Sequence, residues 1–137
     1  MDKKIRAFIR ASSMGDIEKV KFYLNEGMDP NTNDKYGFPA LVHACRKGHI
    51  DIVKLLIEKG ANINFRDDRN RTPFFHAVTF LRYDIVKYLS ENNCDINSID
   101  IYNWTALDFA IYSSNIKMTE FLKNLGVKSN KTTTKID

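Results

Sequence analysis

The stretch from Asp34 to Asn64, DKYGFPALVHACRKGHIDIVKLLIEKGANIN, decides the fold, because copies of it lie 33 residues away in both directions. At this period four columns of residues stay in phase along the chain. The first two columns are Ala11, Ala44, Ala77 and Ala110, and Asn31, Asn64, Asn97 and Asn130. The other two are Gly27, Gly60, Asn93 and Gly126, and Asp34, Asp67 and Asp100. The chain is therefore one unit written four times, as in a solenoid of stacked repeats.

Length and composition set limits on the class of protein. A chain of 137 residues suits one domain that buries about two-thirds of its unfolded surface. Cys45 and Cys94 have no ligand-like spacing to the three histidines, so neither a disulfide framework nor a zinc site is expected. Residues 1–10 carry five charges and no apolar run, and no stretch approaches the roughly 20 apolar residues of a membrane helix. We therefore expect a soluble, cytoplasmic protein that needs no cofactor or metal.

Each unit shows two short amphipathic helices. The spacing of apolar residues predicts helices over 3–13 and 16–26, then from about Pro39 to Lys47 and from Ile50 to Lys59. In the third unit Thr72 can cap a helix whose first turn holds Pro73. Neither apolar stripe can be covered within one unit, so the units must stack on one another.

The units are expected to form a single domain over residues 1–128, with boundaries at about 1–33, 34–66, 67–99 and 100–128. In the last unit, the column Val20, Val53 and Val86 changes to Thr119, and the column Leu24, Ile57 and Ser90 changes to Lys123, which is typical of a terminal cap. Residues 129–137 include three consecutive threonines and no apolar period, so we predict a disordered tail there.

Several positions call for a left-handed backbone. Asn70 and Asn103 stand where the second unit has Gly37, and Asn93 stands in a glycine column. Glycine and asparagine are the residues that tolerate positive φ, so the backbone requirement is kept while the residue changes.

These features resemble the ankyrin repeat, whose consensus runs D-x-x-G-x-T-P-L-H-x-A, then G-H, an apolar helix, and G-A-D-x-N. The match covers residues 1 to about 130, and it is closest over Gly48–Asn64. The resemblance implies an all-α solenoid of stacked helix-turn-helix units with short hairpin-like loops.

The chain departs from the consensus at two places. No T-P-L-H copy is complete, and the histidine that links adjacent loops in the family is missing from each copy, so the resemblance does not carry over that loop network. The Gly-His reversal becomes Leu81-Arg82 and Ser114-Asn115. An irregular, weaker turn is therefore expected near Leu81.

The resemblance also implies that the loop tips and the exposed face of each unit's first helix bind another protein. The corresponding positions in this chain are Lys35, Tyr36, Phe38, Arg46, Lys47, Asp68, Arg69, Arg71, Thr79, Phe80, Ile101, Tyr102, Trp104, Tyr112 and Ser113. Their chemistry supports the same prediction, because Trp, Tyr and Arg are enriched at the residues that dominate interface energies. The alternative is that some aromatic side chains fold back and shield the turns.

No catalytic constellation is present in the sequence. There is no phosphate-binding glycine loop, no H-E-x-x-H and no paired-cysteine motif, and repeat position explains His43, His49 and His76. We therefore predict a non-catalytic module, monomeric when free, that binds a partner protein. A net charge of +4 and a pI near 9.0 favour a partner with an acidic patch.

Three alternatives stay open at this stage. The partner can be an enzyme or toxin that this chain neutralises. A basic stripe can instead bind an anion or nucleic acid, although the nearby acids disfavour this; its members would be Lys35, Arg46, Lys47, Arg66, Arg69 and Arg71. Self-association through Tyr102 and Trp104 is the third.

Overall fold

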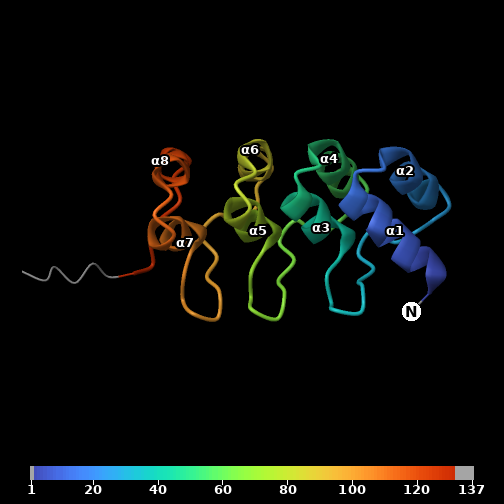
Figure 1. Ribbon diagram of the computed structural model, residues 1–137, viewed down its shortest axis with the longest axis horizontal. Coiled ribbons are helices and arrows are strands. Elements are labelled where there is room, and N and C mark those ends of the chain that lie inside the picture. Colours follow the sequence, from blue (N-terminus) through green and yellow to red (C-terminus); the bar gives the residue numbers. More distant parts are fainter. Residues whose placement is uncertain (1, 132–137) are drawn as a thin grey trace, which may run out of the picture.

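The computed structural model describes residues 2–131, and over that range the helices pair into four stacked units (Figure 1). The helices are α1 (Lys3–Met14), α2 (Ile17–Asn25), α3 (Ala40–Lys47), α4 (Ile50–Glu58), α5 (Pro73–Thr79), α6 (Tyr83–Glu91), α7 (Ala106–Tyr112) and α8 (Ile116–Asn124). We call α1, α3, α5 and α7 the inner helices and α2, α4, α6 and α8 the outer helices. The two sets form parallel rows, and three long loops project from the inner row (Figure 1). The predicted all-α solenoid is confirmed.

Local sequence signals explain where the helices begin. Thr72 caps α5 by accepting a hydrogen bond from the Phe75 amide at 3.2 Å, and Pro73 follows in the first turn, as predicted. Thr105 and Asp108 form a reciprocal capping box at the start of α7. Most helix bounds lie within a residue or two of the predicted ones.

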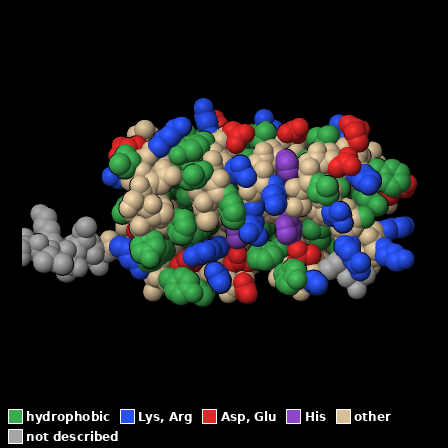
Figure 2. Space-filling view, in the orientation of Figure 1, with side chains coloured by type: hydrophobic (Ala, Val, Ile, Leu, Met, Phe, Trp, Pro, Cys, Tyr) green, Lys and Arg blue, Asp and Glu red, His purple; other side chains and the backbone are tan. Residues whose placement is uncertain are grey.

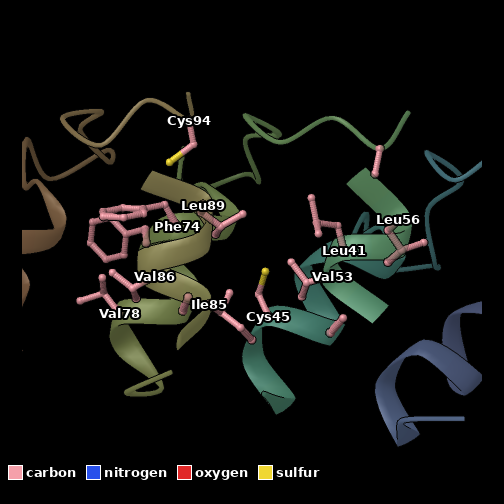
Figure 3. Close-up of a cluster of buried hydrophobic side chains, with 14 of the residues drawn as sticks. Leu41, Cys45, Val53, Leu56, Phe74, Val78, Ile85, Val86, Leu89 and Cys94 are labelled. Atoms are coloured by element: carbon pink, nitrogen blue, oxygen red, sulfur yellow. The ribbon is translucent and has the colours of Figure 1, made fainter. Parts of the chain in front are cut away.

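The core runs through all four units. Ala44, Ala77 and Ala110 are at most 1% exposed. Only a small side chain fits at these positions, because inner helices of successive units pack directly on one another. Larger side chains from adjacent units fill the remaining space, and Figure 3 shows Leu41 and Phe74 directed into this cluster.

The asparagine column links each unit to the next. The side-chain oxygen of Asn31 accepts a hydrogen bond from the Asn62 amide at 2.8 Å, and that of Asn64 accepts one from the Asp95 amide at 2.8 Å. Asn97 bonds the Lys128 amide in the same way at 2.7 Å. These three members of the column therefore each satisfy a backbone donor one unit further along, whereas the Asn130 side chain donates to the Asn103 carbonyl of its own unit.

A second link runs in the opposite direction. The His49 ring lies 3.0 Å from the Ser13 carbonyl at the end of α1, and the Arg82 guanidinium donates to the Arg46 carbonyl at 3.0 Å near the end of α3. Arg82 therefore makes the contact with the preceding inner helix that His49 makes one unit earlier. Both contacts satisfy carbonyls that a helix terminus leaves unpaired.

The reversal before each outer helix has a left-handed residue. Gly15 and Gly48 have φ of +83° and +85°, and the third and fourth units place Leu81 and Ser114 there at +60° and +58°. The turn at Leu81 is not irregular in its backbone, because Leu81 takes the left-handed conformation of the glycines that it replaces and the Arg82 amide bonds the Ala77 carbonyl as the His49 amide bonds that of Ala44. The weakness expected there stays a prediction. Asn70, Asn93 and Asn103 each have φ of +63°, as the sequence indicated.

The last unit ends the stack with more exposed side chains. Ile111 is 49% exposed, whereas Cys45 and Val78 at the same repeat position are 0% and 1% exposed. Thr119 and Lys123 lie at the positions predicted for a cap, and Lys123 is exposed.

The described part of the chain contacts the last unit beyond the predicted domain boundary. Ser129 and Asn130 bond the Asp108 carboxylate, and the Lys131 ammonium donates to the Tyr102 carbonyl at 3.0 Å. Residues 129–131 of the predicted tail thus pack on the last unit. Residues 132–137 lie outside the described range.

Candidate partner-binding face

The three loops share one turn built around an aspartate, and we call residues 34–38, 67–71 and 100–104 the finger tips. In the first tip, one carboxylate oxygen of Asp34 accepts hydrogen bonds from the amides of Tyr36 and Phe38 at 2.8 and 3.0 Å. Asp67 and Asp100 make the equivalent pairs in their own tips. Each aspartate of this column therefore holds the backbone of its own finger tip in one conformation, which fixes where the tip side chains lie.

The second carboxylate oxygen in the first two tips pairs with a histidine. The distance from Asp34 to the His43 ring nitrogen is 2.7 Å, and from Asp67 to the His76 ring nitrogen it is 2.8 Å. These histidines anchor each finger to the inner helix of its own unit. Sequence reasoning missed this role, although the constant spacing of nine residues between the aspartate and the histidine was a usable signal.

These hydrogen bonds shift the carboxylate pKa values. Burial on its own raises the pKa of Asp67, but hydrogen bonds from His76 and from the Arg71 and Arg69 amides outweigh it and hold the pKa below its usual value. The same balance of burial against hydrogen bonds from Phe38, His43 and Tyr36 lowers the pKa of Asp34.

The third finger is anchored differently. Phe109 replaces the histidine there, and Arg71 of the preceding finger donates to the Asp100 carboxylate at 3.1 Å. The Arg71 guanidinium also lies 4.8 Å from the Phe75 ring centre. Adjacent fingers are further joined by the Ile101 amide, which bonds the Arg69 carbonyl at 3.0 Å. A loop network therefore exists without the family's histidine, built from other residues.

Charge is segregated between the two rows of helices. The inner helices contain six Lys and Arg residues but one acidic residue, Asp108, which is buried and hydrogen-bonded. The outer helices contain six acidic and six basic residues. Figure 2 shows the Lys and Arg side chains spread over the molecule, with histidines near the centre of the face. The inner row is therefore the positively charged one.

Eight of the fifteen sequence-predicted residues line one groove of about 460 Å³ between the first and second fingers. We call it the central groove, and its predicted members are Tyr36, Phe38, Arg46, Asp68, Arg69, Arg71, Thr79 and Phe80. Tyr36 and Phe80 are 71% and 40% exposed. The Arg46 guanidinium lies 4.8 Å from the Phe80 ring centre, which holds a cation and an aromatic face side by side at the surface.

Two of these eight are held by the protein itself. The Phe38 ring makes edge contacts with the rings of His43 and His76, at 6.0 and 6.1 Å between centres. The Arg71 side chain is only 17% exposed because of its pair with Asp100. Their geometry fits positioning of the fingers, so that the free side chains of the central groove are chiefly Tyr36, Arg69 and Phe80.

The five predicted residues of the fourth unit form a separate group. Trp104 lies 4.8 Å from Tyr112 and 6.5 Å from Phe109 between ring centres, and the Lys131 ammonium lies over the Trp104 ring at 5.5 Å. Trp104 is therefore half-buried by its own neighbours, as the alternative interpretation of the aromatic tips allowed. The exposed members are Ile101, Tyr102, Tyr112 and Ser113.

The two remaining predicted residues lie apart from the central groove. Lys35 borders a second groove beside α1, together with Tyr36. Lys47 is exposed at the end of α3.

Among the described residues we looked for a metal-binding cluster and for a reactive thiol. Residues 2–131 contain no cluster of three His, Cys, Asp or Glu side chains that could hold a metal ion. Burial raises the pKa of both thiols, that of Cys94 to about 12, where the Asp95 charge adds to the effect. A protonated thiol is a poor nucleophile. Over the same residues no helix has the length and apolar content to cross a membrane.

Paired helices, stacked units and projecting fingers define a helical repeat solenoid whose inner helices carry an excess of cations over acids. Family models agree: a model of three ankyrin repeats matches residues 8–100, and a model of many copies matches residues 82–122. The chain belongs to the ankyrin-repeat family, whose repeats are protein–protein interaction modules and are generally non-catalytic. The comparison with curated proteins gives no match.

Proposed function

We propose that this protein is a non-catalytic module that binds an acidic surface of a partner protein on its inner face. The central groove is the centre of that site. The observation that carries the proposal is the charge segregation, in which six cations and a single buried acid lie on the inner helices while the outer helices are balanced.

The finger acids strengthen this proposal. Asp34, Asp67 and Asp100 each have one carboxylate oxygen on backbone amides and the other on His43, His76 or Arg71. They are therefore committed to the fold and repel an incoming carboxylate less than free acids would. Asp68 at a tip is exposed and is the acid that a partner would meet.

The central groove also brings together aromatic and cationic side chains, the residue types that dominate binding energy at protein interfaces. Tyr36 and Phe80 bury large areas at a low cost in side-chain entropy, and Arg69 offers a planar fork for a carboxylate. The rigid hydrogen-bonded tips hold these groups in place before binding, which lowers the entropy lost on association. We further propose that the protein acts as a monomer in the cytoplasm, where its two buried thiols stay reduced.

The test is affinity capture from native lysate followed by mass spectrometry. Wild type is compared with the central-groove variant Arg69→Ala/Phe80→Ala and with the outer-helix control Lys21→Ala/Phe22→Ala. The control matches the test because Phe22 is 56% exposed and Lys21 lies beside it on α2.

We expect wild type and the control to capture the same protein and the central-groove variant to lose it. Capture by all three would place the site elsewhere and overturn the proposal. Capture of nucleic acid, lost steeply as salt rises, would favour an anion-binding function instead.

A further inference from the structure

A second groove lies between α1 and the first finger. Of its lining residues, Lys35 and Tyr36 are predicted from the sequence to bind a partner, and none of those on α1 is. Its volume is about 670 Å³, larger than that of the central groove. We call it the N-terminal groove. Its lining residues are Arg6, Ile9, Arg10, Ser13, Met14, Asp34, Lys35, Tyr36 and His43.

The rim of this groove is cationic. Arg6 and Arg10 lie one helical turn apart on α1, so they share a face, and Lys35 approaches from the finger on the other side. None of these three side chains forms an ion pair with another part of residues 2–131. Asp34 is the one acid in the lining, and it is bonded to His43. The rim therefore offers three cations to a ligand.

The groove also offers apolar contacts. Ile9 is 5% exposed and belongs to the core, so that it forms a buried edge of the groove. Met14 and Tyr36 are 66% and 71% exposed, which is high for large side chains that border one concave site. Methionine adapts to differently shaped ligands, and tyrosine packs well on an apolar side chain.

We propose that the N-terminal groove binds an acidic linear segment of a protein, in which carboxylates flank one apolar or aromatic side chain. The carboxylates pair with Arg6, Arg10 and Lys35, and the apolar side chain lies between Met14 and Tyr36. This deepens the proposed function and rests on it, since Tyr36 borders both grooves and a partner that crosses it contacts both. The volume falls in the range of sites that enclose small ligands, which suits one anchoring side chain and its neighbours.

The chemistry favours a peptide over a nucleic-acid strand. Three cations are few for a repeating phosphate backbone, and the Asp34 carboxylate in the lining opposes a continuous line of anions. A peptide can place its carboxylates only where the cations are, and can fill the apolar part with a side chain.

The test measures fluorescence anisotropy of a labelled synthetic peptide in which one phenylalanine is flanked on both sides by pairs of acidic residues. Two control peptides replace the acids by their amides or the phenylalanine by glycine. The test variant is Arg6→Glu/Arg10→Glu. Its control, Lys54→Glu/Lys87→Glu, changes the net charge equally on the outer helices α4 and α6.

We expect wild type to bind the acidic phenylalanine peptide and both control peptides to bind at least about tenfold more weakly. The Arg6→Glu/Arg10→Glu variant should also lose at least about tenfold in affinity, and Lys54→Glu/Lys87→Glu less than about threefold, because close charge pairs act mainly locally in salt. Circular dichroism shows whether each variant is folded. A Met14→Ala variant gives a second test that leaves the charge unchanged, and its affinity should fall.

Three results would overturn the proposal. The first is absence of saturable binding of the peptide to wild type up to about 1 mM. The second is equal weakening by the two charge-reversal variants, which would indicate only long-range attraction. The third is tighter binding of a single-stranded oligothymidylate than of the peptide. Capture of a partner through Arg69 and Phe80 could still succeed in each case, so failure here is distinct from failure of the proposed function.

Discussion

Single residues of this chain act on the unit next to their own. Arg82 reaches back to the carbonyl of Arg46, and it passes so close to Gly48 that a Cβ there would lie 3.1 Å from the arginine side chain. His49 and Gly15 repeat this arrangement one unit earlier, with a would-be contact of 2.7 Å. The glycine is therefore required for two reasons, its left-handed backbone and the space that the next unit's side chain occupies.

Gly48→Ala should lower the free energy of unfolding by more than Gly37→Ala does. Both residues have similar φ, +85° and +83°, so each alanine adds left-handed strain of about 1–2 kcal/mol. At Gly37 nothing lies within 4 Å of the added Cβ, whereas at Gly48 the Arg82 side chain must also move. Urea unfolding of both variants measures the difference. Equal losses would show that the Arg82 contact adds nothing.

Leu81→Gly should raise the free energy of unfolding by up to about 1 kcal/mol. Leu81 has φ of +60°, which costs a side chain with a Cβ more than the entropy that glycine loses on folding. The side chain is 46% exposed, so that its removal costs only part of the burial of a core leucine. Thermal or urea unfolding checks the sign, and a clear loss of stability would show that Leu81 contributes more by packing than its backbone costs.

Asp67→Asn should destabilise the protein at neutral pH, and less so in acid. The pKa of Asp67 is lowered in the folded state, so its carboxylate stabilises the fold fully above the unfolded-state pKa of about 3.9. This contribution is lost as the pH falls through the folded-state pKa. Urea unfolding between about pH 7 and about pH 2.5 should show the gap between wild type and variant closing below about pH 4. A gap that stays constant would contradict the assignment.

At the scale of elements, periodicity predicted the helices well and the bonds between them poorly. The spacing of Val53 and Leu56 marks the apolar stripe of α4 in the sequence, because a helix that must stack shows a fixed spacing, and both residues are buried there together with Ile52. The hydrogen bond from Arg82 to the Arg46 carbonyl could not be predicted from periodicity. An arginine makes it here, whereas a histidine, His49, makes the equivalent bond one unit earlier.

The candidate site, too, could be predicted from the sequence only in part. Residue type and family position predicted Tyr36, Arg69 and Phe80, which line the central groove together. They also selected Trp104, whose ring is covered by Tyr112 and Phe109, a contact that depends on side-chain packing across three positions. Residue type did not single out the α1 side of the N-terminal groove, because a terminal repeat presents a polar helix face to water whether or not it binds a ligand.

Asn64→Ala should weaken the junction between the second and third units. Its side-chain oxygen accepts the Asp95 amide at 2.8 Å, so alanine leaves that donor without its partner and should cost about 1 kcal/mol. Asn64 is exposed, which allows water to replace the bond in part and keeps the cost at this level. Urea unfolding measures it, and no change at all would mean that water substitutes fully.

At the scale of the whole molecule, a solenoid is held by contacts between neighbouring units, so it can open locally at one junction. Cys45 reports on one such junction. In Figure 3 its side chain lies in the buried cluster between the helices of the second and third units, and the residues at the same repeat position show what covers it. Val78 is buried under a following unit, whereas Ile111, which has none over the described residues, is 49% exposed.

Labelling of Cys45 by iodoacetamide near neutral pH should therefore measure opening between the second and third units. The native thiol is 0% exposed and its pKa is raised by burial and by Cys94, so that it reacts only after opening. Arg82→Ala removes a bond across this junction and should speed labelling several-fold. His49→Ala removes the matching bond between the first and second units, and should change the Cys45 rate much less. Mass spectrometry identifies the labelled cysteine. Equal acceleration by both variants would mean that the thiol becomes accessible only when the whole chain unfolds, and that the four units behave as one cooperative body.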